Sequence, residues 1–577
     1  MQKYPGSIHC HTDYSNIRLR DSINKMPDLI NYAIELGHSC IGITDHECLS
    51  SFVDVENYVE SLKKKAQKNN EEFSLGNKIL EDEKIEFINT NDLIGNRIYK
   101  AGLKFLFLVS LQEVFNDFDV VYEHSVPRGM LGVLKGSRIL SHEDISKIKA
   151  RMCKLISDNE LITKLNVSPK DAIKYFNNRK EYEKANNIQN ISDKVVNLYK
   201  LKNNLNYFYS LMPYSTGALE KFELVYLGNN RIILLFPTTR SNGMVPEYVH
   251  YDKIIESFMD GKNWLNNLNM PYITDLNKDV GNGKIINFIK SCELMFNLNI
   301  SDVARIIEER KDVKFILIAG PSSSGKTTTT SRLASYFETL GYNPIKISLD
   351  DYFVDREETP KDEFGNYNFE CLEALDVKLF NENLNNLLKG ESVKFPKYNF
   401  MTGLREYYKE EIKMTDKSIF LIEGLHALNE NLTKEIEEKY KFKIYLSPFI
   451  PLSIDKYNYV STIDLRLLRR IVRDNRTRGY DVIKTIDNWQ SVRNGEEKYI
   501  FPYIHQANVI INTALAYEVG VLKVYVEPLL LSVSVDSIYY EEARRLVDFL
   551  KQFFPIPGEY VNDESILREF IGGRYND

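Results

Sequence analysis

Cysteine is scarce in this chain, and long apolar runs are missing from it. The six cysteines among 577 residues include no Cys-x-x-Cys pair, which argues against a disulfide framework or a zinc ribbon. No apolar run reaches the roughly 18–20 residues that cross a bilayer, and the start of the chain holds no apolar signal core. These absences predict reduced thiols, no membrane partner and a cytoplasmic location.

An excess of either charge is also missing. Lys plus Arg is 74 and Asp plus Glu is 81, so the formal net charge is −7. This mildly acidic balance argues against a polycation that coats nucleic acid or an anionic membrane. Apolar residues at 43% and charged residues at 27% are typical of folded domains. At roughly 100–200 residues per domain, the length predicts about four domains.

The hydrophobic pattern divides the chain into five regions. Residues 1–78 show a β-α-β pattern, residues 79–240 an α+β pattern, and residues 241–310 a helical connector. From 311 to 530 apolar strands alternate with helices, which predicts an α/β domain whose parallel sheet is covered by helices on both faces. Residues 531–577 are expected to form a helical extension. The expected apolar strands are 314–320, 344–351, 418–424, 442–447, 507–514 and 522–528.

A phosphate-binding motif lies between the first of these strands and a helix. Residues 320–327 read GPSSSGKT and match G-x-x-x-x-G-K-[ST]. In such a loop backbone N–H groups converge on phosphate oxygens, Lys326 neutralises phosphate charge and Thr327 ligates Mg²⁺. The motif therefore predicts a nucleotide site. Its expected residues are Gly320, Pro321, Ser322, Ser323, Ser324, Gly325, Lys326, Thr327 and Thr328.

Acidic and basic side chains follow at positions that suit phosphoryl transfer. Asp350 ends the next strand, where a carboxylate can accept the proton of an attacking hydroxyl. Glu423 ends another apolar strand and is expected on the metal side of the site. Arginines recur at helical spacing from Arg466 to Arg473, which predicts a cationic lid. Strand-end acids without a role and a solvated basic helix face are the alternatives.

A series of motifs over about residues 240–577 resembles one family. The motifs are GPSSSGKTT, ISLDDYFVDRE, NYNFECLEALD, FPKYNFMTG, IEGLHALNE, TIDLRLLRRIVRDNRTRGY, SVRNGEEKYIFP and SILREFIGG. In this order they resemble the uridine kinase/phosphoribulokinase family, and in particular long bacterial uridine kinase-like nucleoside kinases. The resemblance implies transfer of the γ-phosphoryl group of ATP to a nucleoside 5′-hydroxyl, with Mg²⁺.

The same resemblance assigns residues to roles. The residues implied in catalysis are Asp350, Lys326, Arg469, Arg473 and Arg478. Those implied in nucleoside binding are Glu373, Tyr398 and Phe400, and those implied in holding Mg²⁺ are Thr327 and Glu423.

The region 79–240 resembles a different family. EKIEFINT is similar to the end of a TGS domain, and YFYSLMPYSTGALEKFEL is similar to the second additional domain of threonyl-tRNA synthetases. That domain edits with two His on a helix and a later Cys and His. The corresponding positions here are Ala101, Phe105, Tyr207 and Leu211. The resemblance therefore implies loss of metal-dependent deacylation and leaves contact with RNA, or a regulatory role, as the expectation.

Four of the nine His lie within the first 46 residues. The segments HCHTDYS from His9 and GITDH ending at His46 resemble the first two motifs of the PHP domain of DNA polymerase III α subunits, in which His and Asp bind metals. Lys78 stands where the resemblance implies the next metal-ligating Glu, and a cation there opposes metal binding. We therefore expect a truncated, inactive fragment. Its vestigial metal candidates are His9, His11, Asp45 and His46.

Three functions compete on this sequence. One is a nucleoside kinase, the second is a metal-dependent phosphoesterase or exonuclease of the PHP type, and the third is an RNA-binding regulator that senses nucleotide. The complete motif series after residue 311 favours the kinase over the second function, which has two motifs and one broken ligand. The sequence leaves an oligomer open.

Overall fold

The computed structural model describes residues 85–573 apart from 192–193, 362–364 and 366, and it also gives the bounds of four short strands near the N-terminus. Strands β1 (Cys40–Ile43) and β2 (Ser51–Asp54) pair antiparallel. Strand β3 (Lys65–Lys68) pairs with both β4 (Glu71–Phe73) and β5 (Ile85–Ile88). The vestigial metal candidates His9, His11, Asp45 and His46 and the cation Lys78 lie outside the described residues.

The middle region is α+β, as the sequence predicts. One antiparallel sheet has the strand order β11-β12-β7-β6, and a second has the order β10-β9-β8. The strands are β6 (Asp119–Val126), β7 (Gly129–Lys135), β8 (Ile162–Val167), β9 (Val196–Leu201), β10 (Asn204–Tyr207), β11 (Glu223–Gly228) and β12 (Arg231–Leu235). The helices are α4 (Leu93–Val114), α5 (His142–Ser157), α6 (Pro169–Asn178) and α7 (Tyr182–Asn190).

The local sequence explains where the helices of this region begin and what they bury. Ser141 caps the N-terminus of helix α5. Its hydroxyl accepts from the Asp144 amide, and the Asp144 carboxylate accepts from the Ser141 amide, which together form a capping box. Helix α4 is apolar along most of its length, and its side chains from Leu103 to Leu111 are almost all buried in one cluster with both sheets. Helix α4 is therefore the central element of this region's core.

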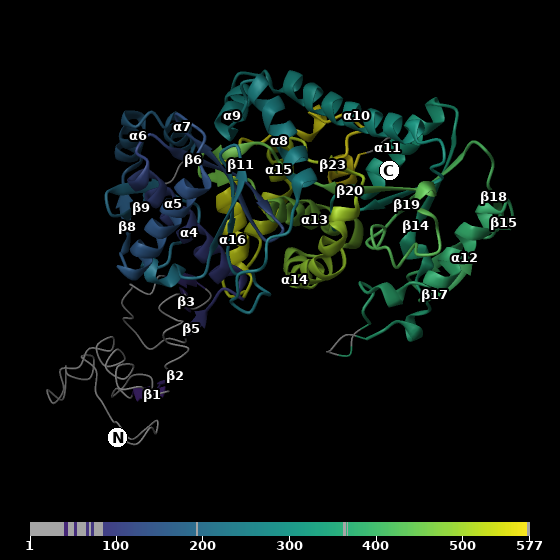
Figure 1. Cartoon of the computed structure of the whole chain (residues 1–577), viewed down its shortest axis with the longest axis horizontal. Coiled ribbons are helices and arrows are strands. Elements are labelled where there is room, and N and C mark those ends of the chain that lie inside the picture. The colour runs from purple at the N-terminus through teal and green to yellow at the C-terminus, as the bar shows by residue number, and fades with distance from the viewer. Residues whose placement is uncertain are drawn as a thin grey trace.

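Three helices connect the middle region to the C-terminal region. They are α8 (Asp252–Asn267), α9 (Ile273–Gly281) and α10 (Ile285–Glu309), and they confirm the helical pattern expected here. Helix α10 packs against α11 (Lys326–Thr339), and Figure 1 shows it extended along one side of the molecule. Among the described residues no helix is both long and apolar enough to cross a bilayer.

Five parallel strands form the central sheet of the C-terminal region, in the order β14-β19-β13-β20-β23. The strands are β13 (Phe315–Ala319), β14 (Asn343–Ser348), β19 (Ser418–Glu423), β20 (Lys441–Ser447) and β23 (Val509–Asn512). Along β13, Ile316 and Ile318 belong to one buried cluster, whereas Phe315 and Leu317 belong to another. Because each cluster contains helices, both faces of the sheet are covered, which confirms the predicted fold class.

The helices on these two faces come from the connector before residue 311 and from the region after it. One cluster includes α10, α11, α13 (Thr462–Arg478), α14 (Val482–Tyr499), α15 (Glu518–Leu531), α16 (Tyr540–Leu550) and α17 (Arg568–Ile571). The other includes α8 and α12 (Val377–Leu388). Two hairpins extend from the second face: β15 (Ser392–Val393) with β18 (Ile412–Lys413), and β16 (Pro396–Asn399) with β17 (Leu404–Tyr407).

One predicted strand is wrong. Residues 522–528 do not join the sheet but lie inside helix α15. This helix buries side chains on several faces, including Val519, Val521 and Val526. A short apolar run that is buried all round has no clear period, so the sequence pattern alone cannot distinguish a strand from a helix there.

A short hairpin joins the middle and C-terminal regions. It consists of β21 (Ser453–Asp455) and β22 (Asn458–Tyr459), and it leads directly into α13. The buried side chain of Tyr457 packs in the core of the middle region, and its hydroxyl donates to Asp119 at 2.8 Å. The Lys104 ammonium donates to the Tyr457 carbonyl at 2.5 Å. The element that precedes the arginine helix is therefore held by the middle region.

Candidate functional site

The phosphate-binding motif forms the turn between β13 and α11. Ser323 and Gly325 have positive φ angles of 59° and 81°, which bend the loop back over the helix N-terminus. An added Cβ at Gly320 would lie 2.9 Å from the Leu446 carbonyl oxygen, so a side chain there would meet backbone. Lys326 donates to the carbonyls of Gly320 at 2.9 Å and Pro321 at 3.3 Å. Residues 320–325 thus form the loop, and the predicted residues 326–328 form the first turn of α11 directly after it.

Two of the predicted acids lie at the carboxyl ends of neighbouring strands. Ser348 of β14 is paired with Glu423 of β19, and Asp350 follows on the turn after β14. Burial raises the pKa of Asp350 and of Glu423, and the ammonium of Lys326 partly offsets the rise in both. Both carboxylates therefore lie within the field of the same cation at this edge of the sheet.

The same edge of the sheet suits a divalent cation. The Thr327 hydroxyl lies 3.5 Å from a Glu423 carboxylate oxygen, and oxygen atoms of this kind are the ligands that Mg²⁺ prefers. The charge of Asp350 contributes to the raised pKa of Glu423, and a dication between them would relieve this repulsion. Among the described residues no group of three His, Cys, Asp or Glu side chains gathers into a complete metal site. Thr327 and Glu423 therefore fit an ion that is completed by water and phosphate oxygens.

A further carboxylate, which the sequence did not single out, lies within the field of Asp350. Burial raises the pKa of Glu370 to about 6, and the nearby charges of Glu496 and Asp350 add to the rise. The predicted Glu373 lies three residues on, and its side chain is exposed. Both glutamates stand in the same NYNFECLEALD motif, so only the fold distinguishes the one beside Asp350.

The arginines of α13 divide into two groups. Arg466 and Arg469 are almost fully buried beneath the phosphate loop. Arg466 pairs with Glu496 and donates to the Ser322 carbonyl at 2.8 Å. Arg469 pairs with Glu518 at 2.6 Å and donates to the Ser323 carbonyl at 3.2 Å. These two guanidinium groups hold the loop from below.

The second group of arginines gathers on Asp474, whose side chain is fully buried. Arg470, Arg473 and Arg478 lie 3.2, 2.9 and 3.5 Å from its carboxylate oxygens. Arg470 also donates to the Ser322 hydroxyl at 2.8 Å, which brings it to the phosphate loop. The predicted Arg478 is half-exposed at the end of the helix. The buried carboxylate of Asp474 therefore positions these three arginines, of which Arg470 reaches the phosphate loop.

An aromatic group stands next to the acids. Tyr398 is buried on hairpin β16–β17, and its amide donates to Asp351 at 3.3 Å. Its ring lies 5.1 Å from Phe400 and 5.5 Å from Phe353. Phe400 is mostly exposed at the hairpin tip, and the buried Tyr398 hydroxyl has no hydrogen-bond partner within the described part of the chain. The exposed ring of Phe400, held by the buried rings of Tyr398 and Phe353, is a suitable surface for a planar base.

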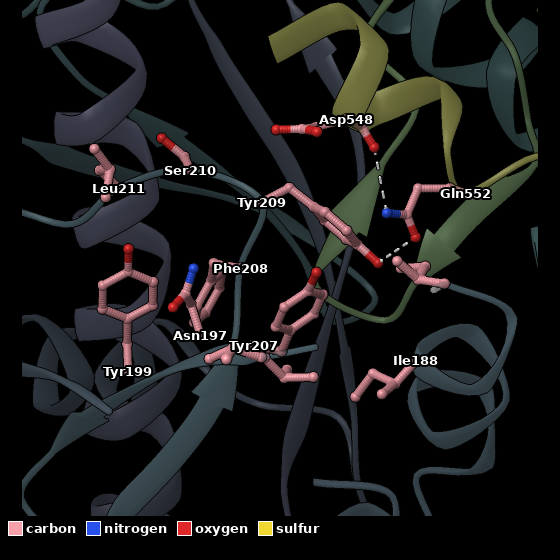
Figure 2. Close-up of a pocket in the computed structure, with 13 residues that line it drawn as sticks. Ile188, Asn197, Tyr199, Tyr207, Phe208, Tyr209, Ser210, Leu211, Asp548 and Gln552 are labelled. Carbon is pink, nitrogen blue, oxygen red and sulfur yellow. Dashed lines mark hydrogen bonds between the residues drawn. The ribbon is translucent and has the colours of Figure 1, made fainter. Parts of the chain in front are cut away.

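Two of the four editing-site positions of the middle region line a cavity of about 250 Å³ (Figure 2). Tyr207 and Leu211 are on its wall, whereas Ala101 and Phe105 are buried within α4. Helix α16 and the turn after it close the cavity through Asp548 and Gln552, and the Tyr209 hydroxyl donates to Gln552 at 2.9 Å (Figure 2).

A parallel sheet, a phosphate loop at a helix N-terminus and acids at the ends of neighbouring strands define the C-terminal region as a P-loop kinase fold. Residues 315–519 match the model of the phosphoribulokinase/uridine kinase family. The uridine kinase of Staphylococcus aureus strain JH9 is 30% identical over 202 residues, which cover 35% of this chain and 88% of that protein. The chain belongs to the phosphoribulokinase/uridine kinase family, and it is an ATP-dependent kinase.

Two further proteins are similar to part of this chain. The uridine kinase of Halobacterium salinarum is 29% identical over 196 residues, covering 34% of this chain and 77% of that protein. The structure of a possible uridine kinase from Bacillus stearothermophilus has 18% identity and a TM-score of 0.26, and the match covers 37% of this chain and 97% of that chain.

The N-terminal part matches a second family model. Residues 7–123 match the PHP domain, which confirms the predicted PHP relationship. The match extends past residue 78 into α4 and β6, whose described side chains pack in the core of the middle region. The finer resemblances to threonyl-tRNA synthetase and to DNA polymerase III stay predictions.

Proposed function

We propose that this kinase transfers the γ-phosphoryl group of ATP to the 5′-hydroxyl of a nucleoside, with uridine or cytidine as acceptor. One observation carries the proposal: Asp350 lies within the field of the phosphate-loop lysine, Lys326, and its neighbour Asp351 accepts from the amide of Tyr398, whose ring packs with Phe353 and Phe400. A phosphate donor on one side and a planar base on the other would place a sugar hydroxyl at Asp350.

The roles of the residues follow from their charges and surroundings. Asp350 accepts the proton of the attacking hydroxyl. Lys326 leaves its two carbonyl partners and neutralises charge on the β- and γ-phosphates. Arg470 and Arg473, ordered by Asp474, stabilise the charge that moves with the phosphoryl group. Thr327 and Glu423 would hold Mg²⁺, which would supply positive charge beside the phosphates.

The acceptor side adds one residue to the predicted set. The half-buried carboxylate of Glu370 lies within the field of Asp350 and is a suitable acceptor for sugar hydroxyl protons, because hydrogen bonds to an ionised acceptor are strong. We assign Arg469 to support of the phosphate loop, since its guanidinium is fully used by Glu518 and backbone carbonyls. The predicted roles of Glu373 and Arg478 stay proposals at the rim of the site.

The test uses purified protein, ATP, Mg²⁺ and a panel of nucleosides. Asp350→Asn is expected to lower kcat by about 10²–10⁴-fold while ATP binding stays nearly unchanged. The exposed Asp312, just before β13, provides the matched control Asp312→Asn, which is expected to keep full activity. Because burial raises the pKa of Asp350, kcat of the wild type should fall on acidification at a higher pH than an ordinary Asp would give. Failure to phosphorylate any nucleoside would refute the proposal.

The other expectations from the sequence add no competing function. Contact of the middle region with RNA, an oligomer, a cytoplasmic location and hydrolysis by the PHP part gain no support from the described residues and stay predictions. The kinase assignment rests on residues 315–519, which match the family model.

A further inference from the structure

The C-terminal end of the described chain lies against the phosphate loop. Ile566 is fully buried, and an added Cβ at Gly325 would lie 2.3 Å from its side chain. Phe570 is also fully buried, and the guanidinium of Arg469 lies 4.8 Å from the centre of its ring. Arg476 of α13 donates to the carbonyls of Phe570 and Glu569, both at 3.3 Å. The segment around α17 is therefore fixed between the loop and the arginine helix.

This segment places a carboxylate at the first turn of α11. The helix begins after Gly325, which has no side chain to cap it, so its first amides have no acceptor within the helix. A Glu569 carboxylate oxygen accepts from the Thr328 amide at 3.3 Å and from the Thr328 hydroxyl at 2.6 Å. Glu569 thus caps, from about 240 residues later in the chain, the helix that binds phosphate.

A nucleotide needs the donors that Glu569 occupies. Phosphate groups bind at the N-terminal amides of the helix after this loop, where the helix dipole favours negative charge. The carboxylate is drawn to the same end for the same reason. The charge of Glu569 also contributes to the raised pKa of Glu423 on the metal side. A polyphosphate and the Glu569 carboxylate therefore compete for one positive end of α11.

We propose that Glu569 is an internal anion that holds the phosphate-binding end of α11 and that an incoming nucleoside di- or triphosphate displaces it. The proposal deepens the proposed function and rests on it for the identity of the ligand. The half-buried Glu569 side chain can rotate away while Ile566 and Phe570 keep the backbone anchored. The contact is autoinhibitory, because it lowers nucleotide affinity without blocking the site permanently.

The test measures binding rather than catalysis. Glu569→Gln removes the charge and keeps the shape, so ADP and inorganic pyrophosphate, both without metal, should bind about three- to ten-fold more tightly by calorimetry. Glu569→Ala removes the acceptor as well and should tighten binding at least as much. Glu564→Gln is the matched control, because this exposed glutamate of the same segment contributes only its backbone carbonyl to Arg332. Its affinity should equal that of the wild type.

Several outcomes would overturn the proposal. Unchanged or weaker pyrophosphate binding by both Glu569 variants would show that the carboxylate does not compete. Weaker binding of Mg²⁺-ATP alone would assign Glu569 to the metal instead. Loss of the folded state in both variants, followed by circular dichroism on heating, would assign it a purely structural role. Failure of the proposed function is a separate result: the wild type would then bind nucleotide without phosphorylating a nucleoside, or bind none at all.

Discussion

Loss of one negative charge beneath the phosphate loop is expected to destabilise the C-terminal region strongly. Glu496 accepts from Arg466 through both carboxylate oxygens, from Arg493 at 2.9 Å and from the Ser322 amide at 3.2 Å. The side chains of Glu496 and Arg466 are each only 1% exposed, so water cannot replace either partner. The change Glu496→Gln keeps the shape and leaves the buried guanidinium without its counter-ion.

The expected magnitude follows from this burial. Burial alone would raise the pKa of Glu496, but Arg466 and Arg493 lower it overall, so the carboxylate is ionised in the folded state. Removal of one partner of a buried pair costs about 3–5 kcal/mol of unfolding free energy. For a domain of this size each kcal/mol lowers the melting temperature by about 2–4 °C, so a fall of about 10 °C is expected. The KM for ATP should also rise, because the Ser322 amide loses a charged acceptor.

Thermal unfolding followed by circular dichroism, together with ATP titration, measures both effects. The matched control is Asp302→Asn, which breaks the ion pair of Asp302 with Arg305 at 2.7 Å, where the side chains are 60% and 70% exposed. Exposed pairs of this kind contribute about 0.2–1 kcal/mol, so the control should melt within a few degrees of the wild type. Equal melting temperatures for Glu496→Gln and Asp302→Asn would refute the argument from burial.

Two more predictions concern the acceptor side and the junction of the regions. Glu370→Gln should raise the KM for the nucleoside about ten-fold or more, because a buried acceptor is lost, whereas the exposed Glu373→Gln should have the smaller effect in the same assay. Burial lowers the pKa of His124 to about 3, and its ring stacks on Phe258 and lies 3.1 Å from the Thr462 hydroxyl. On acidification the unfolded chain protonates this histidine at a higher pH than the folded chain does. The contribution of His124 to the free energy of unfolding is therefore complete above about pH 6.5 and falls below it, by about 2 kcal/mol at pH 5. His124→Asn should lack this part of the pH dependence in denaturant titrations; an identical slope would contradict the assignment.

The strands and the phosphate loop were predictable because their signals are local. The apolar runs of β13, β14, β19, β20 and β23 stand alone between polar turns, and the loop motif has fixed spacing. The run at 522–528 was misassigned because α15 is buried on several faces and its pattern carries no period. Helices that are distant in the sequence bury this segment, and the sequence pattern does not show that packing.

The candidate site was predictable only in part, for the same reason. Asp350 and Glu423 end predicted strands, and parallel strands bring their carboxyl ends to one edge. Glu370 and Glu373 are three positions apart in a segment outside the α-helices and the sheet. Only the fold therefore shows that Glu370 is the less exposed of the two. The partners of Arg466 and Arg469 come from α14 and α15, at separations of 30 and 49 residues, and no spacing rule predicts them.

Support for the phosphate loop extends beyond the part of the chain that matches the family. Glu496 and Glu518 lie within residues 315–519, and each ties an arginine of α13 to the loop. Ile566 lies after that segment, yet its side chain packs against Gly325 of the loop. A loop whose backbone donors must be fixed before phosphate arrives needs such contacts, because preorganised donors cost no reorganisation during the reaction. The segment around Ile566 therefore belongs to the support of the phosphate loop, although it lies after the residues that match the family model.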